Sequence, residues 1–222
     1  FDPLTLGIVD SYERPGRSVT GVVAIPIDFN LTIDMLRALL PDLKAIALVG
    51  GSTPNDPLMT GIVHRQVTAF SQACAVRGME LVLLAQPAPD EIIDALKRAQ
   101  REQRIGVVCA VNDIFVSAYM EKLIEGCKAV GVPLCTSELS SVYHGAAIGI
   151  GAHGGLYGVH GAALAYEILV QKRRASSLPV IIPSVEQSMR YNYEALVAQG
   201  VTLTPATYHL LNMVSVFFNA EQ

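Results

Sequence analysis

The sequence predicts an α/β fold made of doubly wound parallel sheets, because two features of the chain are typical of that class. Short apolar or β-branched runs alternate with segments of helical periodicity at a repeat of about 30 residues, as in parallel strands joined by crossover helices. Residues 45–49 (AIALV) are apolar at every position, as expected of a strand buried on both faces of a sheet. The repeated units share no sequence template, which excludes a solenoid.

The composition fits a packed globular core. Of 222 residues, 51% are hydrophobic and 16% are charged, and the formal net charge is −4. These values exclude a disordered or collagen-like chain, and the mild negative charge argues against nucleic acid as a partner. Charges, Pro or Gly interrupt every apolar run before the ~18 residues that a membrane-spanning helix needs, so we expect a soluble protein.

Capping residues and helix breakers predict the first elements. Asp2 can cap free N–H groups and Pro3 is tolerated in a first turn, so we expect a helix over 2–14. This helix should end at the Arg14-Pro15-Gly16 segment. The same reasoning predicts strands at 18–24 and 45–49, an amphipathic helix at 31–40 ended by Pro41, and a helix at 57–77 closed by Gly78.

The rest of the chain continues this alternation. Residues 90–102 carry acidic groups in the first turn and basic groups in the last, which complements a helix dipole. Gly131 should end a helix at 114–130. Strands are expected at 79–84, 105–111, 133–135 and 146–151. Further on we expect a helix of small residues at 155–172, a proline-flanked edge strand at 179–183, a short helix at 193–199 and an apolar helix at 206–218.

The cysteines and histidines do not form a recognisable metal site. Cys74, Cys109, Cys127 and Cys135 lack CxxC or ligand spacing, so we expect buried core thiols rather than zinc ligands or disulfides. His153 and His160 are spaced to share a helix face, but no third ligand accompanies them.

The chain begins without Met or a leader pattern, so we expect a processed or trimmed product whose compartment cannot be deduced from a leader.

The GxGxxG pattern that ends at Gly154 offers two interpretations. It follows a strand and precedes a helix, as a dinucleotide fingerprint does, yet the next strand ends in Pro183-Ser184 without the acidic residue that holds a ribose. We therefore favour a close crossing of chain segments, permitted by glycine, and expect no cofactor. A hydrolase would need Ser52, Ser140 or Ser141 with His144 or His153, but no GxSxG elbow is present.

Polar residues directly follow several of the expected strands. The carboxyl ends of parallel strands form the crevice in which ligands bind in open α/β sheets. There, carboxylates and amides can hold an amine or hydroxyl groups of a small molecule. The predicted ligand-binding residues are Gly51, Ser52, Thr53, Asn112, Asp113, Ser137, Glu138 and His153.

An ordered series of short motifs runs through most of the chain. They are Asp2-Pro3-Leu4, Arg14-Pro15-Gly16, Ser18-Val19-Thr20-Gly21, the segment 39–44, Asp113, Val132-Pro133, and Ser141-Val142-Tyr143-His144-Gly145-Ala146 before a helix with Gly158 and Ala165. This series resembles the ABC-transporter substrate-binding proteins of the tryptophan-binding-protein-like group, which have the type I periplasmic binding protein fold.

The resemblance implies two α/β lobes around a cleft that closes on a small ligand for delivery to an ABC permease, in a periplasmic or extracytoplasmic location and without enzymatic activity. Family members carry a further half-lobe before the Asp-Pro helix. We therefore expect one complete and one partial lobe: 1–24 and 146–173 as the partial first lobe, and 25–145 and 174–222 as the second lobe with a C-terminal crossover. A homodimer would cover the incomplete lobe.

Some positions depart from the family pattern. Gly50-Gly51 stand where members often have Tyr-Asn, His153 stands where an Asp is common, and Tyr143-His144 replace Glu-Arg, whereas Asp113 and Ser137 are in place. Fewer carboxylates favour an anionic or aromatic acid ligand over an amino acid, or indicate lost binding. The rival functions are a ligand-sensing module of a signalling protein and an α/β nucleotide-dependent enzyme.

Overall fold

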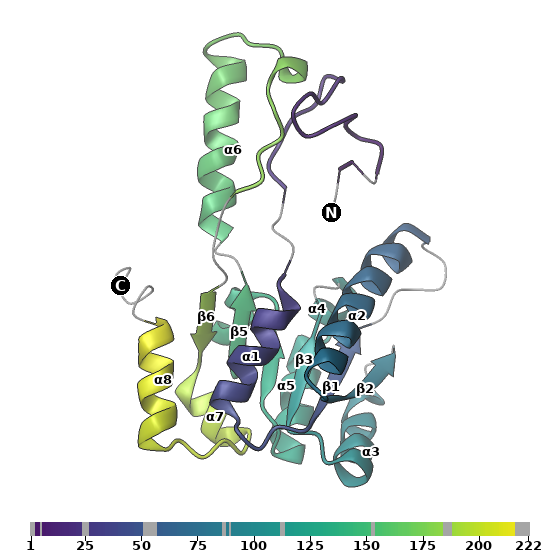
Figure 1. Cartoon of the computed structure of the whole chain (residues 1–222), viewed down its shortest axis with the longest axis vertical. Coiled ribbons are helices and arrows are strands. Elements are labelled where there is room, and N and C mark those ends of the chain that lie inside the picture. Colours follow the sequence, from purple (N-terminus) through teal and green to yellow (C-terminus); the bar gives the residue numbers. More distant parts are fainter. Residues whose placement is uncertain are drawn as a thin grey trace. The chain divides into compact units, whose positions relative to one another are not determined.

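A computed structural model describes residues 3–4, 6–23, 27–50, 57–85, 88, 90–111, 114–151, 154–183 and 188–215. The chain divides into two compact units, a larger one of residues 28–151 and 188–222 and a smaller one of residues 1–27 and 152–187 (Figure 1). The lobe boundaries that we expect from the family resemblance remain predictions.

The larger unit is built on a six-stranded sheet in the order β2-β1-β3-β4-β5-β6. The first five strands pair in parallel, which confirms the expected α/β class, and β6 pairs antiparallel with β5. β4 and β5 are hydrogen-bonded neighbours in this sheet. The strands are β1 Ala45–Gly50, β2 Glu80–Ala85, β3 Val107–Ala110, β4 Leu134–Thr136, β5 Ile148–Gly151 and β6 Ser188–Tyr191.

Helices cover both faces of this sheet. The direction of chain travel reverses after β2, so right-handed crossovers put α2 on one face and α3 and α5 on the other. The contacts agree, since α1 packs on α2 and α3 packs on α5 (Figure 1). The helices of this unit are α1 Phe29–Leu39, α2 Pro57–Val76, α3 Ile92–Gln103, α4 Ile114–Ala118, α5 Met120–Val130, the 3₁₀ helix η1 Leu139–His144, α7 Tyr193–Ala198 and α8 Pro205–Ser215.

The core lies between the sheet and its helices. β1 is buried along its whole length, as its uniformly apolar sequence predicts. One buried cluster joins strand residues such as Val49 and Val108 to Leu96 of α3 and Leu123 of α5. Cys74, Cys109, Cys127 and Cys135 are buried free thiols, which confirms the expectation of core cysteines, and burial raises the pKa of Cys74 to about 11.

The smaller unit contains α6 Gly154–Leu169 and the 3₁₀ helix η2 Ala175–Ser177. The helix expected over 2–14 is wrong: its described residues form turns and bends, and Gly7 adopts φ +63°, which an α-helix cannot continue through. The strands expected at 18–24 and 179–183 reduce to one bridge between Val22 and Ile181. Across the described residues of both units, no helix has the length and apolar character needed to span a bilayer.

Gln199 joins three parts of the larger unit from a fully buried position just after α7. Its Oε1 accepts a hydrogen bond from the Leu134 N–H of β4 at 2.7 Å, and its Nε2 donates to the Gly145 carbonyl at 3.0 Å. One amide therefore satisfies a donor at the start of β4 and an acceptor just after η1. No apolar side chain could do this, since both backbone groups would lose their partner.

We predict that Gln199→Met lowers the free energy of unfolding by roughly 2–4 kcal/mol, because one buried and one partly buried backbone group lose their hydrogen bonds while the side-chain volume is nearly kept. Urea denaturation followed by circular dichroism measures this change. Gln103→Met, at the half-buried end of α3, is the matched control and should change stability by less than about 0.5 kcal/mol. Equal effects of the two substitutions would contradict the bridging role of Gln199.

Candidate functional site

The structure describes Ser137 and Glu138 among the predicted ligand residues, and both directly follow β4. Their position confirms the expectation that polar residues stand at the carboxyl end of a strand. The other predicted positions lie outside the described residues: Gly51, Ser52, Thr53, Asn112, Asp113 and His153.

The backbone of 137–139 crosses β5 at very short range. A Cβ added to Gly151 would lie 2.6 Å from the Ser137 carbonyl oxygen, and one added to Gly149 would lie 3.1 Å from the Leu139 Cα. Glycine is required where two backbones approach this closely. The expected close crossing is confirmed, and it explains the first two glycines of the GxGxxG pattern. The next strand after β5 is antiparallel to it, whereas the dinucleotide fingerprint needs a parallel one.

The crossing segment continues into η1, which is held against the sheet by hydrogen bonds. Thr136 Oγ1 donates to the Glu138 carbonyl at 2.8 Å, and Asn192 Nδ2 donates to the Val142 carbonyl at 3.3 Å. Gly145 ends η1 at φ +106°, a conformation that favours glycine. The backbone that carries Glu138 and η1 is therefore fixed from both ends.

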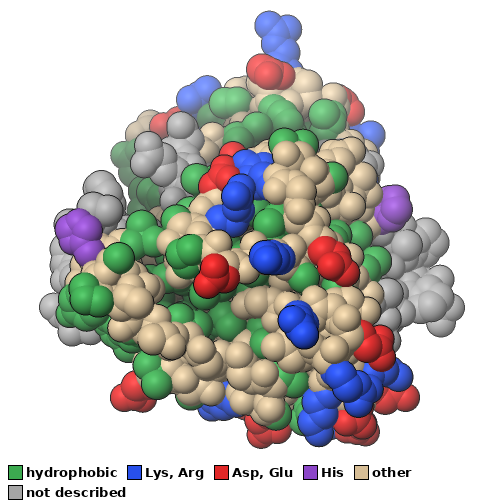
Figure 2. All heavy atoms as spheres, turned by 60° about the horizontal axis from the view of Figure 1, so that its bottom comes forward, with side chains coloured by type: hydrophobic (Ala, Val, Ile, Leu, Met, Phe, Trp, Pro, Cys, Tyr) green, Lys and Arg blue, Asp and Glu red, His purple; other side chains and the backbone are tan. Residues whose placement is uncertain are grey.

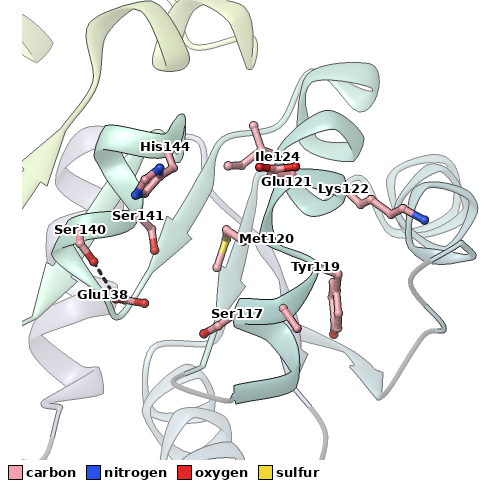
Figure 3. A pocket seen from close by; sticks show the side chains of 11 residues that line it. Ser117, Tyr119, Met120, Glu121, Lys122, Ile124, Glu138, Ser140, Ser141 and His144 are labelled. Atoms are coloured by element: carbon pink, nitrogen blue, oxygen red, sulfur yellow. Dashed lines mark hydrogen bonds between the residues drawn. The ribbon is translucent and has the colours of Figure 1, made fainter.

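A pocket of about 590 Å³ lies between η1 and the segment that contains α4 and α5 (Figure 3). These two walls follow β3 and β4, which are neighbours in the sheet, so the pocket belongs to the carboxyl edge at which ligands bind in such sheets. Its volume is in the range of small-molecule sites. The lining residues are Ser117, Ala118, Tyr119, Met120, Glu121, Lys122, Ile124, Glu138, Ser140, Ser141 and His144.

The η1 wall is polar. The Glu138 carboxylate accepts a hydrogen bond from Ser140 Oγ at 2.7 Å. Ser141 is only 5% exposed, and within the described part of the chain its hydroxyl has no hydrogen-bond partner. Figure 3 shows the side chains of Glu138, Ser141 and His144 along this wall. A hydroxyl that lines a pocket and has no partner in the protein is suited to bind a polar group of a ligand.

The opposite wall carries the apolar surface of the pocket together with some polar side chains. Met120 extends from the start of α5 into the pocket, and the buried Ile124 follows one turn later (Figure 3). Lys122 points away from the pocket and forms an ion pair with Asp90, whose pKa is lowered by this hydrogen bond. The pocket thus combines an apolar surface with a few convergent polar groups, as ligand sites commonly do.

Of the ligand residues predicted from the sequence, Glu138 lines this pocket. The sequence offers Ser140, Ser141 and His144 as parts of a hydrolase and places Ser141 and His144 in a family motif, but it did not predict them as ligand residues, and it did not reveal the α5 wall. Neither serine is hydrogen-bonded to His144 among the described residues, so the pair of nucleophile and base that hydrolysis needs is not formed there. Within the described part of the chain, no group of three or more His, Cys, Asp or Glu side chains is placed to hold a metal ion.

A second pocket, of about 500 Å³, lies at the amino ends of the strands. Figure 2 looks onto this edge, where hydrophobic side chains are exposed between scattered acidic and basic groups. Leu43, Val132 and Val201 belong to its apolar lining, and Thr202 and Thr204 are among its polar residues. None of the predicted ligand residues lines it, so the pocket at the carboxyl edge is the stronger candidate.

We predict that Gly151→Ala lowers the free energy of unfolding by about 2 kcal/mol, because the new Cβ would overlap the Ser137 carbonyl and force the crossing apart. Gly158→Ala is the matched control. It lies in α6 with no atom within 4 Å of the added Cβ, and alanine favours helices by about 0.5–1 kcal/mol over glycine. Urea titration compares the two variants, and a Gly151→Ala protein as stable as the parent would refute the close crossing.

The sequence matches one known protein family. The family described as ABC transporter substrate binding protein matches residues 1–209. A search of curated proteins found no significant match.

Solved structures extend this likeness. The chain superimposes on a conserved domain protein from Vibrio cholerae (TM-score 0.75, 22% identity, 94% of this chain and 67% of that chain). It also matches an ABC domain in complex with L-Trp from Streptococcus pneumonia, with a TM-score of 0.73 and 18% identity over 94% of this chain and 68% of that chain. A third match is a ligand-free, open substrate-binding protein with adhesive properties from Clostridium difficile, with a TM-score of 0.70 and 20% identity over 92% of this chain and 65% of that chain. The chain spans about two thirds of these structures, and the likeness shows a shared fold.

Proposed function

The chain belongs to the family of ABC transporter substrate-binding proteins, which are binding proteins and not enzymes, and on this premise we propose that it captures a small organic solute for import. The ligand class that we propose is an amino acid or an aromatic or other organic acid. A structurally similar domain is in complex with L-Trp, which supports this size and polarity of ligand.

The observation that carries the proposal is the pocket at the carboxyl edge of the larger unit. It joins the Ser141 hydroxyl, which has no hydrogen-bond partner among the described residues, to the apolar surface of Met120 within about 590 Å³. Polar groups at such an edge orient a ligand, while apolar surface supplies affinity. The predicted contacts that lie outside the described residues remain part of this proposal.

The resemblance completes the proposal. The partner is an ABC permease in the membrane, and the protein acts in the periplasm or elsewhere outside the cytoplasm. That a second lobe closes over the ligand stays a prediction of the resemblance, as do the extents of the lobes.

We expect native mass spectrometry to detect a one-to-one adduct of the chain with at least one of L-Trp, L-Phe and indole-3-propionate. Met120→Trp should reduce that binding about tenfold or more, because the indole would occupy the space of the ligand. Val197→Trp is the control, since Val197 is exposed on α7 and does not line the pocket. An adduct that survives Met120→Trp, or no adduct with any of the three, would contradict the proposed site.

Self-association is a separate prediction. In α6 only Leu164 is buried, and the exposed residues of this segment include Val159, Tyr166, Leu169 and Val170. An exposed apolar surface favours association, and a second copy of the chain is the partner that we propose. Sedimentation velocity at micromolar concentration should show a dimer that Leu169→Asp converts to a monomer. A monomeric parent protein would exclude this homodimer.

A further inference from the structure

The polar side chains of the η1 wall are arranged by the period of a 3₁₀ helix. Such a helix has three residues per turn, so residues three apart lie above one another. Glu138, the residue before η1, and Ser141 and His144 within it follow this spacing and all line the pocket. Figure 3 shows the three side chains in this order along one wall. A ligand in the pocket therefore meets a carboxylate, a hydroxyl and an imidazole in one row.

The charged groups of the pocket are mainly acidic. Glu138 and Glu121 both line it, and within the described residues neither forms an ion pair with a basic side chain. The one lysine of the lining, Lys122, is engaged by Asp90 and extends away from the cavity. An anionic ligand would approach two carboxylates, whereas a cationic ligand would supply the charge that they lack.

Ser141 provides an independent indication that this wall binds a ligand. Ser141 is only 5% exposed and lines the pocket, and its hydroxyl has no partner among the described residues, although Ser140, its neighbour, is hydrogen-bonded to Glu138. A hydroxyl can accept a hydrogen bond from an N–H group, and the nearby carboxylates can accept the others. An ammonium group has three such donors and no acceptor.

We propose that the ligand of this pocket carries an ammonium group on an apolar body, with the ammonium held by Glu138 and Ser141 and the apolar body against Met120 and Ile124. This inference rests on the proposed function and decides between the ligand classes that it leaves open. The departures from the family pattern favoured an anionic or aromatic acid, but the charges of the described pocket favour an organic cation or an amino acid bound through its ammonium.

Three ligands with the same indole ring test the charge preference: tryptamine, with an ammonium only, L-Trp, with an ammonium and a carboxylate, and indole-3-propionate, with a carboxylate only. Isothermal titration calorimetry should give a Kd for tryptamine at least about tenfold lower than that for indole-3-propionate, because charge-assisted hydrogen bonds form only with the amine. The Kd for L-Trp shows whether the ammonium is preferred as part of an amino acid or of a free amine. The proposal holds whichever of L-Trp and tryptamine binds more tightly.

Glu138→Gln assigns the contact. It keeps the size of the side chain and removes its charge, so the affinity for tryptamine should fall about tenfold or more while that for indole-3-propionate stays equal or rises. Ser141→Ala should also weaken tryptamine binding. Glu125→Gln is the matched control, because Glu125 is an exposed carboxylate of α5 that does not line the pocket, and it should leave both affinities unchanged.

The outcomes separate this inference from the proposed function. If indole-3-propionate binds as tightly as tryptamine and Met120→Trp abolishes its binding, the site stands and the ammonium preference is wrong. If tryptamine binds more tightly but Glu138→Gln and Glu125→Gln have equal effects, the assigned contact is wrong. If none of the three ligands binds, both the site and the preference are refuted.

Discussion

The contact on which the candidate site depends is the crossing of the 137–139 backbone over Gly149 and Gly151 of β5. Because no side chain separates the two backbones, η1 lies directly on the sheet, and its polar residues reach the pocket. Gln199 and Asn192 hold the same segment through the backbone carbonyls at its end. Binding sites on rigid elements keep their geometry better than sites on free loops. The η1 wall is of this kind, although it begins as a loop after a strand.

The fold was largely predictable because its signals are local. The uniformly apolar β1, the dipole-matched α3 and the glycine that ends α5 each identify an element without knowledge of its neighbours. Failures occurred where the deciding signal was weak or tertiary. The first expected helix is replaced by turns and bends, with Gly7 at a positive φ. β6 has one buried residue, Met189, so its sequence shows no apolar run, and its antiparallel pairing with β5 comes from the fold alone.

The site was predictable only in part. The rule that ligands bind at the carboxyl ends of parallel strands selected Glu138, which lines the pocket. The rule does not predict the other residues of the pocket. Ser141 and His144 belong to a 3₁₀ helix that no sequence period predicted. Met120 is there because the expected continuous helix is interrupted at Tyr119, and α5 begins anew at the pocket. Charge is also a property of the assembled pocket, since the pairing of Lys122 with Asp90 leaves the carboxylates in excess.

Hydrogen–deuterium exchange with and without saturating tryptamine tests the central claim most directly, because it reports where the ligand binds without any substitution. A ligand bound between η1 and α5 should slow amide exchange in 139–145 and 117–124, the two walls of the pocket, and leave 200–207 at the opposite edge of the sheet unchanged. Slower exchange confined to 200–207, or no change in either wall under conditions where tryptamine is bound, would contradict the account.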